Sequence, residues 1–226
     1  MRRAIAVVGL LVLPALAHAQ DAPALRTHRL TVAGGVISSG SYDVGSATAE
    51  LRGNALGATA PPFTLFTADS EVSRGTAPEI KVGFAITSRF LFEAGGSVSR
   101  PRIGVAIAAD PEAPAQQLPG EELQQYLFDA SLSWQLPIRM GRRVAPYAIG
   151  GGGYLRQLHE DRTLGETGEV YYAGGGLRYF WRGGHGTQRP LGLRGDVRIN
   201  VRRKGIDFED QMRTYPSFSL LLFVGL

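Results

Sequence analysis

Few residues of this chain have the types and spacing that enzyme chemistry requires. The sequence contains no cysteine, which excludes disulfides, thiolate metal sites and cysteine nucleophiles together. After the N-terminal segment its histidines are His28, His159 and His185, and none has a serine or aspartate at the spacing of a hydrolytic site. We therefore expect no catalytic residues and no cofactor, and we interpret the chain as a protein that is not an enzyme.

The residue spacing gives little support to metal or phosphate binding. Glu160 and Asp161 follow His159, but this trio has no specific metal-ligand spacing, so no metal site is predicted. The glycine runs at 150–153 and 174–176 match neither nucleotide-binding pattern, and no helix is expected after them. A nucleotide site is therefore not expected.

The N-terminus has the three parts of a secretory signal peptide. Two arginines precede an apolar stretch of about a dozen residues, and Ala-His-Ala at 17–19 supplies a small-residue cleavage site. We predict a signal peptide at 1–19, a short segment at 20–27 and one folded domain at 28–226. Removing the two arginines lowers the formal net charge from +4 to +2, so an exported chain of this kind is expected to have no nucleic-acid partner.

The mature chain is dominated by period-two alternation, which is typical of β-strands with two different faces. In residues 191–202, small and apolar residues alternate with a face that carries Arg194, Asp196, Arg198 and Arg202. Seven further segments alternate in a similar way, two of them (28–38 and 145–156) more weakly. The eight predicted strands fall within 28–38, 79–87, 90–99, 125–136, 145–156, 170–181, 191–202 and 215–226.

Long and short links alternate between these segments. An even number of strands of about 10–12 residues, joined in this rhythm after a signal peptide, is typical of a closed membrane barrel with long outer loops. The fold class predicted is therefore all-β: an eight-stranded, antiparallel, up-and-down transmembrane β-barrel. The first link, 39–78, is the longest, and its segments 47–51 and 63–66 either extend the wall or form an extra hairpin. A ten-stranded barrel is the structural alternative.

If the apolar faces meet lipid, charged side chains must lie inside the barrel. Eight strands enclose a lumen just wide enough for side chains to fill it, and unpaired buried charges are too costly to keep. We therefore predict a filled lumen with a network of ion pairs. Its predicted members are Lys81, Glu93, Asp129, Arg178, Arg194, Asp196, Arg198 and Arg202.

Aromatic residues cluster near the short turns on the faces assigned to lipid, where an interfacial girdle is expected. The predicted girdle consists of Phe90, Phe92, Trp134, Tyr147, Tyr179 and Trp181. The sequence has 30 glycines in 226 residues, many of them inside the predicted strands, where they permit the tight bending of a small barrel.

The signal peptide, the eight alternating segments and the charged interior together resemble the small bacterial outer-membrane barrels of the OmpA/OmpX class. The final segment alternates as the last strand does in that family, although Leu226 stands where the family usually ends in phenylalanine. The resemblance implies a monomer in the outer membrane that contacts lipid and lipopolysaccharide and is inserted by the barrel-assembly machinery. The role expected is structural, or interaction with a surface ligand through the loops, and the alternative is a narrow channel or transporter for ions or small molecules.

Overall fold

The computed structural model describes residues 29–52, 62–108, 110, 114–138, 140–141, 143–159, 165–182, 189–207 and 211–226. The predicted signal peptide, the segment at 20–27 and the residues His28, Glu160, Asp161 and His185 lie outside the described residues. Twelve β-strands are formed by the described part of the chain. No helix in this part is long and apolar enough to cross a bilayer.

Eight of the strands close into an antiparallel barrel. Its order around the wall is β1-β12-β11-β10-β9-β8-β5-β4, and β4 pairs with β1 to complete the ring. The predicted eight-stranded antiparallel fold is confirmed, and the ten-stranded alternative is wrong. The strands are β1 (Leu30–Ser39), β4 (Gly75–Ala85), β5 (Phe90–Ser99), β8 (Gln124–Gln135), β9 (Val144–Leu158), β10 (Gly165–Arg182), β11 (Leu191–Lys204) and β12 (Arg213–Gly225).

Both ends of the barrel sequence lie at the same rim as the short turns. The backbone NH of Leu226 donates to the carbonyl of Leu30 at 2.8 Å, and the NH of Ala85 donates to the carbonyl of Arg29 at 2.7 Å. The turn from β4 to β5 is closed by the NH of Ile86 on the carbonyl of Phe90 at 2.9 Å. The longer links therefore emerge at the opposite rim.

Two of the long links are folded as a second sheet. It has four strands in the order β2-β3-β6-β7: β2 (Tyr42–Arg52), β3 (Pro62–Val72), β6 (Arg102–Ala108) and β7 (Gln116–Glu122). The hairpin expected within 39–78 is present as β2 and β3, whereas β6 and β7 lie in a segment that was predicted to be a loop. Pro119 and Gly120 make β7 look like a turn in the sequence, but β7 is an edge strand, where proline is tolerated.

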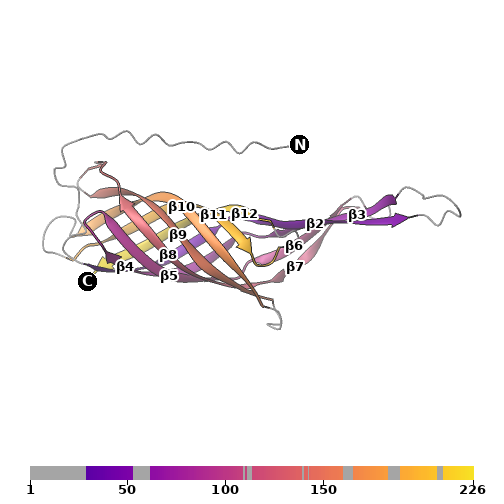
Figure 1. Cartoon of the computed structure of the whole chain (residues 1–226), viewed down its shortest axis with the longest axis horizontal. Coiled ribbons are helices and arrows are strands. Elements are labelled where there is room, and N and C mark those ends of the chain that lie inside the picture. The colour runs from indigo at the N-terminus through magenta and orange to yellow at the C-terminus, as the bar shows by residue number, and fades with distance from the viewer. Residues whose placement is uncertain are drawn as a thin grey trace.

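The second sheet continues one half of the barrel wall. β2 follows β1, β3 precedes β4, β6 follows β5 and β7 precedes β8, and these four barrel strands are neighbours in the wall. Figure 1 shows the four strands projecting beyond the barrel at the rim opposite the short turns. We call this sheet the extension.

The strands of the barrel have an apolar outer face and a polar inner face. On β11, Val197 and Ile199 are 55% and 52% exposed, while Arg198 between them is 2% exposed. Inner glycines allow neighbouring strands to approach closely: a Cβ at Gly174 would collide with the carbonyl oxygen of Val197 and lie 2.9 Å from the Cα of Arg198. The curvature of the wall therefore depends on residues without side chains at such positions.

Candidate functional site: the barrel interior

The interior of the barrel holds nine buried charged side chains from five strands. The basic ones are Lys81, Arg178, Arg194, Arg198 and Arg202, and the acidic ones are Glu79, Glu93, Asp129 and Asp196. The structure thus brings all eight residues of the expected lumen network inside the wall and adds Glu79. Glu79 was missed although it precedes Lys81 by two residues and so shares its face of β4.

Asp196 is the centre of the largest cluster. Its carboxylate accepts hydrogen bonds from Arg194 Nε at 3.2 Å, from the Tyr147 hydroxyl at 2.8 Å and from Arg198 Nε. Arg194 also forms an ion pair with Glu93, and Arg198 also forms one with Glu79 at 3.1 Å. The cluster joins strands β4, β5, β9 and β11 across the lumen.

A second cluster lies around Lys81. The Lys81 ammonium is 2.7 Å from Asp129 Oδ2 and 3.4 Å from Glu79 Oε1, and the hydroxyl of Tyr172 donates to the Asp129 carboxylate. Glu79 also accepts a hydrogen bond from the Ser219 hydroxyl. Since Glu79 contacts both Lys81 and Arg198, the two clusters form one continuous network. Each charged side chain of this network therefore has at least one oppositely charged partner within 4.0 Å.

Two tyrosine rings contact the buried guanidinium groups. Arg178 and Arg194 lie 4.4 Å and 4.9 Å from the centroid of the Tyr147 ring, and Arg198 lies 5.1 Å from that of Tyr172. The sequence pattern does not predict these contacts, because it places Tyr147 in the outer girdle and indicates no role for Tyr172. Cation–π contacts of this kind are strongest in a desolvated site.

Arg178 and Arg202 differ from the other interior arginines. Arg178 donates to the Ser133 hydroxyl at 2.7 Å, and Arg202 donates to the Tyr42 hydroxyl at 2.6 Å and to the Ile206 carbonyl. Neither forms an ion pair with a carboxylate of the described residues within 4.0 Å. The described interior holds five basic and four acidic side chains, so it has one positive charge in excess.

Apolar residues close the interior at both ends. Near the short turns, the rings of Phe180 and Phe223 meet edge to face at 5.3 Å and pack with Ala33, Ala145 and Leu221. At the opposite mouth, residues of the extension pack with residues of the barrel rim. This mouth cluster consists of Tyr42, Val44, Val72, Ile103, Leu123, Ile206 and Tyr215.

Tyr42 connects the mouth cluster to Arg202, one of the buried arginines of the interior. Its ring lies 4.9 Å from the ring of Tyr215 and 4.7 Å from the Arg202 guanidinium, and its hydroxyl accepts a hydrogen bond from Gln157 at 3.4 Å. Burial raises the pKa of the Tyr42 hydroxyl above its usual value, so the hydroxyl stays protonated. This residue comes from the first long link, which the sequence alone could not place at the mouth.

The residues expected in the aromatic girdle divide into two groups. Phe90, Phe92, Trp134 and Trp181 are exposed on the outer wall, where Phe90 stacks on Trp134 at 6.4 Å, and Tyr179 is half-buried beside Trp181. The assignment of Tyr147 to the girdle is wrong, because its side chain is 1% exposed and points into the lumen. The outward-facing residues next to Tyr147 on β9 are small, so the alternation of residue types indicated the wrong face of the strand for Tyr147.

The one histidine in the described part of the chain, His159, contacts the extension. Its Nδ1 lies 2.9 Å from Glu121 Oε1 of β7. Within this part of the chain, no group of three or more histidine, aspartate or glutamate side chains is arranged to hold a metal ion. The absence of an enzyme activity stays a prediction from the sequence.

Comparison with known proteins finds similarity among solved structures only. No family model matches the chain, and no curated protein matches it. Among solved structures, the outer membrane protein OprG from Pseudomonas aeruginosa is similar at a TM-score of 0.47, with 10% sequence identity over 91% of this chain and 97% of that chain. The resemblance to the OmpA/OmpX class therefore stays a prediction.

Proposed function

We propose that this chain is an outer-membrane β-barrel whose lumen is closed and whose function is to present the extension at the cell surface. The outer wall supports the membrane location. Large apolar side chains are exposed around it on every barrel strand except β9, where Tyr154 is exposed. In water such a continuous apolar surface favours aggregation, whereas in a bilayer it is solvated by lipid.

The alternation of short and long links supports one orientation of the barrel in the membrane. In bacterial barrels the short turns face the periplasm and the long links face outward. The extension leaves the rim opposite the short turns (Figure 1), so it faces the outside of the cell in this orientation.

The filling of the lumen by buried side chains is the observation that carries the proposal. A layer of charged pairs and tyrosine rings fills the centre, and apolar clusters cover it on both sides. An ion passing through would have to separate several buried pairs, and breaking one such pair costs about 3–5 kcal/mol. A structural or surface-interaction role fits this interior better than transport.

The alternative function is a narrow channel that prefers anions, and the surplus of interior arginine favours it. Conductance separates the two functions. The purified protein, reconstituted into planar lipid bilayers, is expected to give no stable current steps above background. Steps on the nanosiemens scale, or solute-driven swelling of proteoliposomes, would show that the lumen conducts.

Membrane insertion is tested separately by electrophoresis. The protein is expected to need detergent for extraction, and the unboiled sample is expected to migrate differently from the boiled one, because a closed barrel resists the detergent at room temperature. Extraction in aqueous buffer would contradict the membrane location whatever the conductance is.

A further inference from the structure

The rim of the short turns carries exposed arginines on five of the eight barrel strands. They are Arg29, Arg89, Arg143, Arg182 and Arg189. Arg29, Arg89 and Arg143 immediately precede β1, β5 and β9, and their backbone carbonyls accept hydrogen bonds from neighbouring strands at 2.7, 2.8 and 2.8 Å. Arg182 ends β10, and Arg189 lies two residues before β11. Since these strands are spread around the wall, the arginines surround the rim.

Acidic side chains do not balance these arginines. The described residues of the short turns include no aspartate or glutamate. The five arginines form no ion pair with a carboxylate of the described residues. Leu226 lies at the same rim and brings its terminal carboxylate, one negative charge against five positive ones. This rim therefore has a large excess of positive charge.

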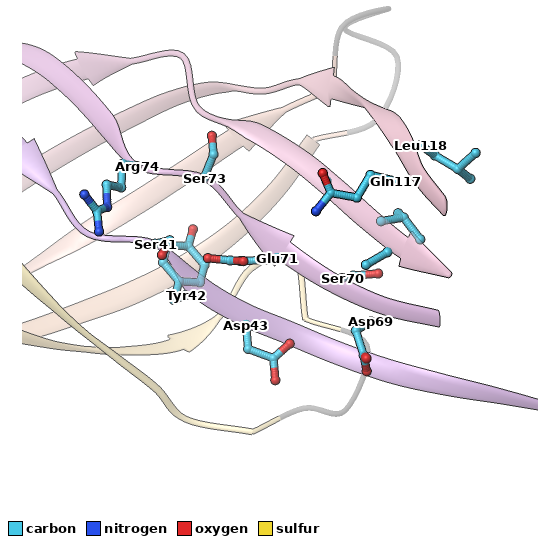
Figure 2. Close-up of a pocket in the computed structure, with 13 residues that line it drawn as sticks. Ser41, Tyr42, Asp43, Asp69, Ser70, Glu71, Ser73, Arg74, Gln117 and Leu118 are labelled. Carbon is cyan, nitrogen blue, oxygen red and sulfur yellow. The ribbon is translucent and has the colours of Figure 1, made fainter. Parts of the chain in front are cut away.

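The opposite end of the molecule has charges of both signs. Outside the lumen, every described acidic side chain belongs to the extension or to the chain around the ends of β10 and β11 at the mouth. Figure 2 shows one pocket of the extension whose lining includes both signs: Asp43, Asp69, Glu71 and Arg74. Arg213 there lies 3.6 Å from Asp43. Uncompensated positive charge is thus a property of the short-turn rim.

The arginines lie directly beyond the aromatic girdle. Arg182 follows Trp181 in β10. Arg89 precedes Phe90, whose ring stacks on Trp134 at 6.4 Å. Interfacial aromatic rings mark the headgroup level of a bilayer, and long basic side chains near this level extend their charge toward the headgroups. The guanidinium groups are therefore placed at the depth of the lipid phosphates.

We propose that this rim binds the headgroups of anionic phospholipids in preference to zwitterionic ones. A guanidinium donates two parallel hydrogen bonds to a phosphate, which both kinds of lipid offer. A zwitterionic headgroup also carries an ammonium group, which a positive rim repels, whereas an anionic headgroup leaves its phosphate uncompensated. The inference rests on the proposed membrane location, and in the proposed orientation these lipids belong to the periplasmic leaflet.

The two tryptophans of the sequence, Trp134 and Trp181, report on this rim because both are exposed on the outer wall beside it. The protein is reconstituted into vesicles of phosphatidylglycerol and phosphatidylcholine in equal parts, with brominated chains on only one of the two lipids. Bromine quenches the fluorescence of a neighbouring tryptophan, so the two mixtures give the relative affinity of the lipids at this rim in either orientation of the barrel. We expect phosphatidylglycerol to be preferred at least about 3-fold at low ionic strength.

The double variant R89Q/R182Q removes the arginine next to each tryptophan and is expected to lower the preference below about 1.5-fold. The matched control is R74Q/R203Q, which makes the same change in net charge at two exposed arginines of the opposite rim. It is expected to keep the wild-type preference. Migration before and after boiling shows that each variant is folded.

Two outcomes would overturn the inference. One is equal quenching by the two brominated lipids in the wild type. The other is an equal loss of preference in the two double variants, which would indicate attraction to net charge alone.

These outcomes are distinct from failure of the proposed function. A barrel that conducts and still prefers phosphatidylglycerol would overturn the closed-lumen proposal and keep the lipid site. A non-conducting barrel without a lipid preference would do the reverse. Quenching by neither brominated lipid would contradict membrane insertion, and with it both proposals.

Discussion

At the scale of single residues, the buried carboxylate of Asp196 is the acceptor on which several interior donors depend. It accepts from two arginines and one tyrosine on strands β9 and β11. Each of these donors is itself buried, so the loss of the acceptor would leave donors without a partner in a desolvated site. Such losses are costly because the group cannot return to water.

Asp196→Asn is therefore expected to lower the free energy of unfolding by about 3–5 kcal/mol, the usual cost of breaking a buried ion pair. Urea unfolding of the protein in lipid vesicles measures this through the fluorescence of Trp134 and Trp181, which lie on the outer wall. Glu50→Gln, at an exposed position of β2, serves as the control and should stay within about 0.5 kcal/mol of the wild type. An equally small effect of D196N would mean that the network contributes little.

At the scale of elements, the glycines of β9 and β10 set how closely the strands approach. Gly174 faces inward, and a Cβ there would collide with the backbone of Val197 and Arg198 on β11. Gly150 on β9 faces outward, and a Cβ there would meet only the Tyr172 carbonyl oxygen at 3.8 Å. The two positions differ in the space around them and not in residue type.

Gly174→Ala is expected to destabilise the barrel by at least about 1–3 kcal/mol, because the added methyl group forces β10 and β11 apart. Gly150→Ala is the matched variant, and it should be neutral or stabilising by up to about 1 kcal/mol because alanine loses less chain entropy on folding. The fraction of folded, heat-modifiable protein and the urea midpoint measure both. Equal effects of the two substitutions would refute this account of wall curvature.

At the scale of the whole molecule, three layers of side chains fill the lumen, and the extension contributes to the layer farthest from the short turns. Tyr42 of the extension contacts a buried interior arginine, Arg202. The layers below it, around Asp196 and around Phe180 and Phe223, belong to the barrel alone.

Tyr42→Ala is thus expected to loosen the junction between the extension and the barrel without opening a pore. Planar-bilayer currents of the variant should stay at background, while hydrogen exchange of the β2 and β3 amides should become faster as the mouth cluster is lost. Wild-type protein in the same lipid is the reference. A conducting Y42A barrel would show that the mouth cluster alone seals the lumen.

The alternation of side chains was enough to predict the barrel and most of its interior. On β11 the charged face is unambiguous, since Arg194, Asp196, Arg198 and Arg202 are two or four residues apart and therefore share one face of the strand. On β9 it failed, because four consecutive glycines give neither face a signal and Tyr147 is amphipathic. When its neighbours are small, a tyrosine is equally compatible with a face toward lipid and a face toward a polar lumen, so the sequence pattern does not distinguish the two.

The sequence by itself determined the all-β class, the number of barrel strands and the polarity of the two faces. Side chains on a strand alternate between its two faces with a period of two residues, and this period is visible in short stretches of the sequence. Only the tertiary structure decided that two links fold as the extension, that Tyr42 closes the mouth and that Asp43, Asp69 and Glu71 gather at one pocket. Those contacts join strands far apart in the chain. Their register is set by closure of the wall and by bulges, which leave no periodic trace in the sequence.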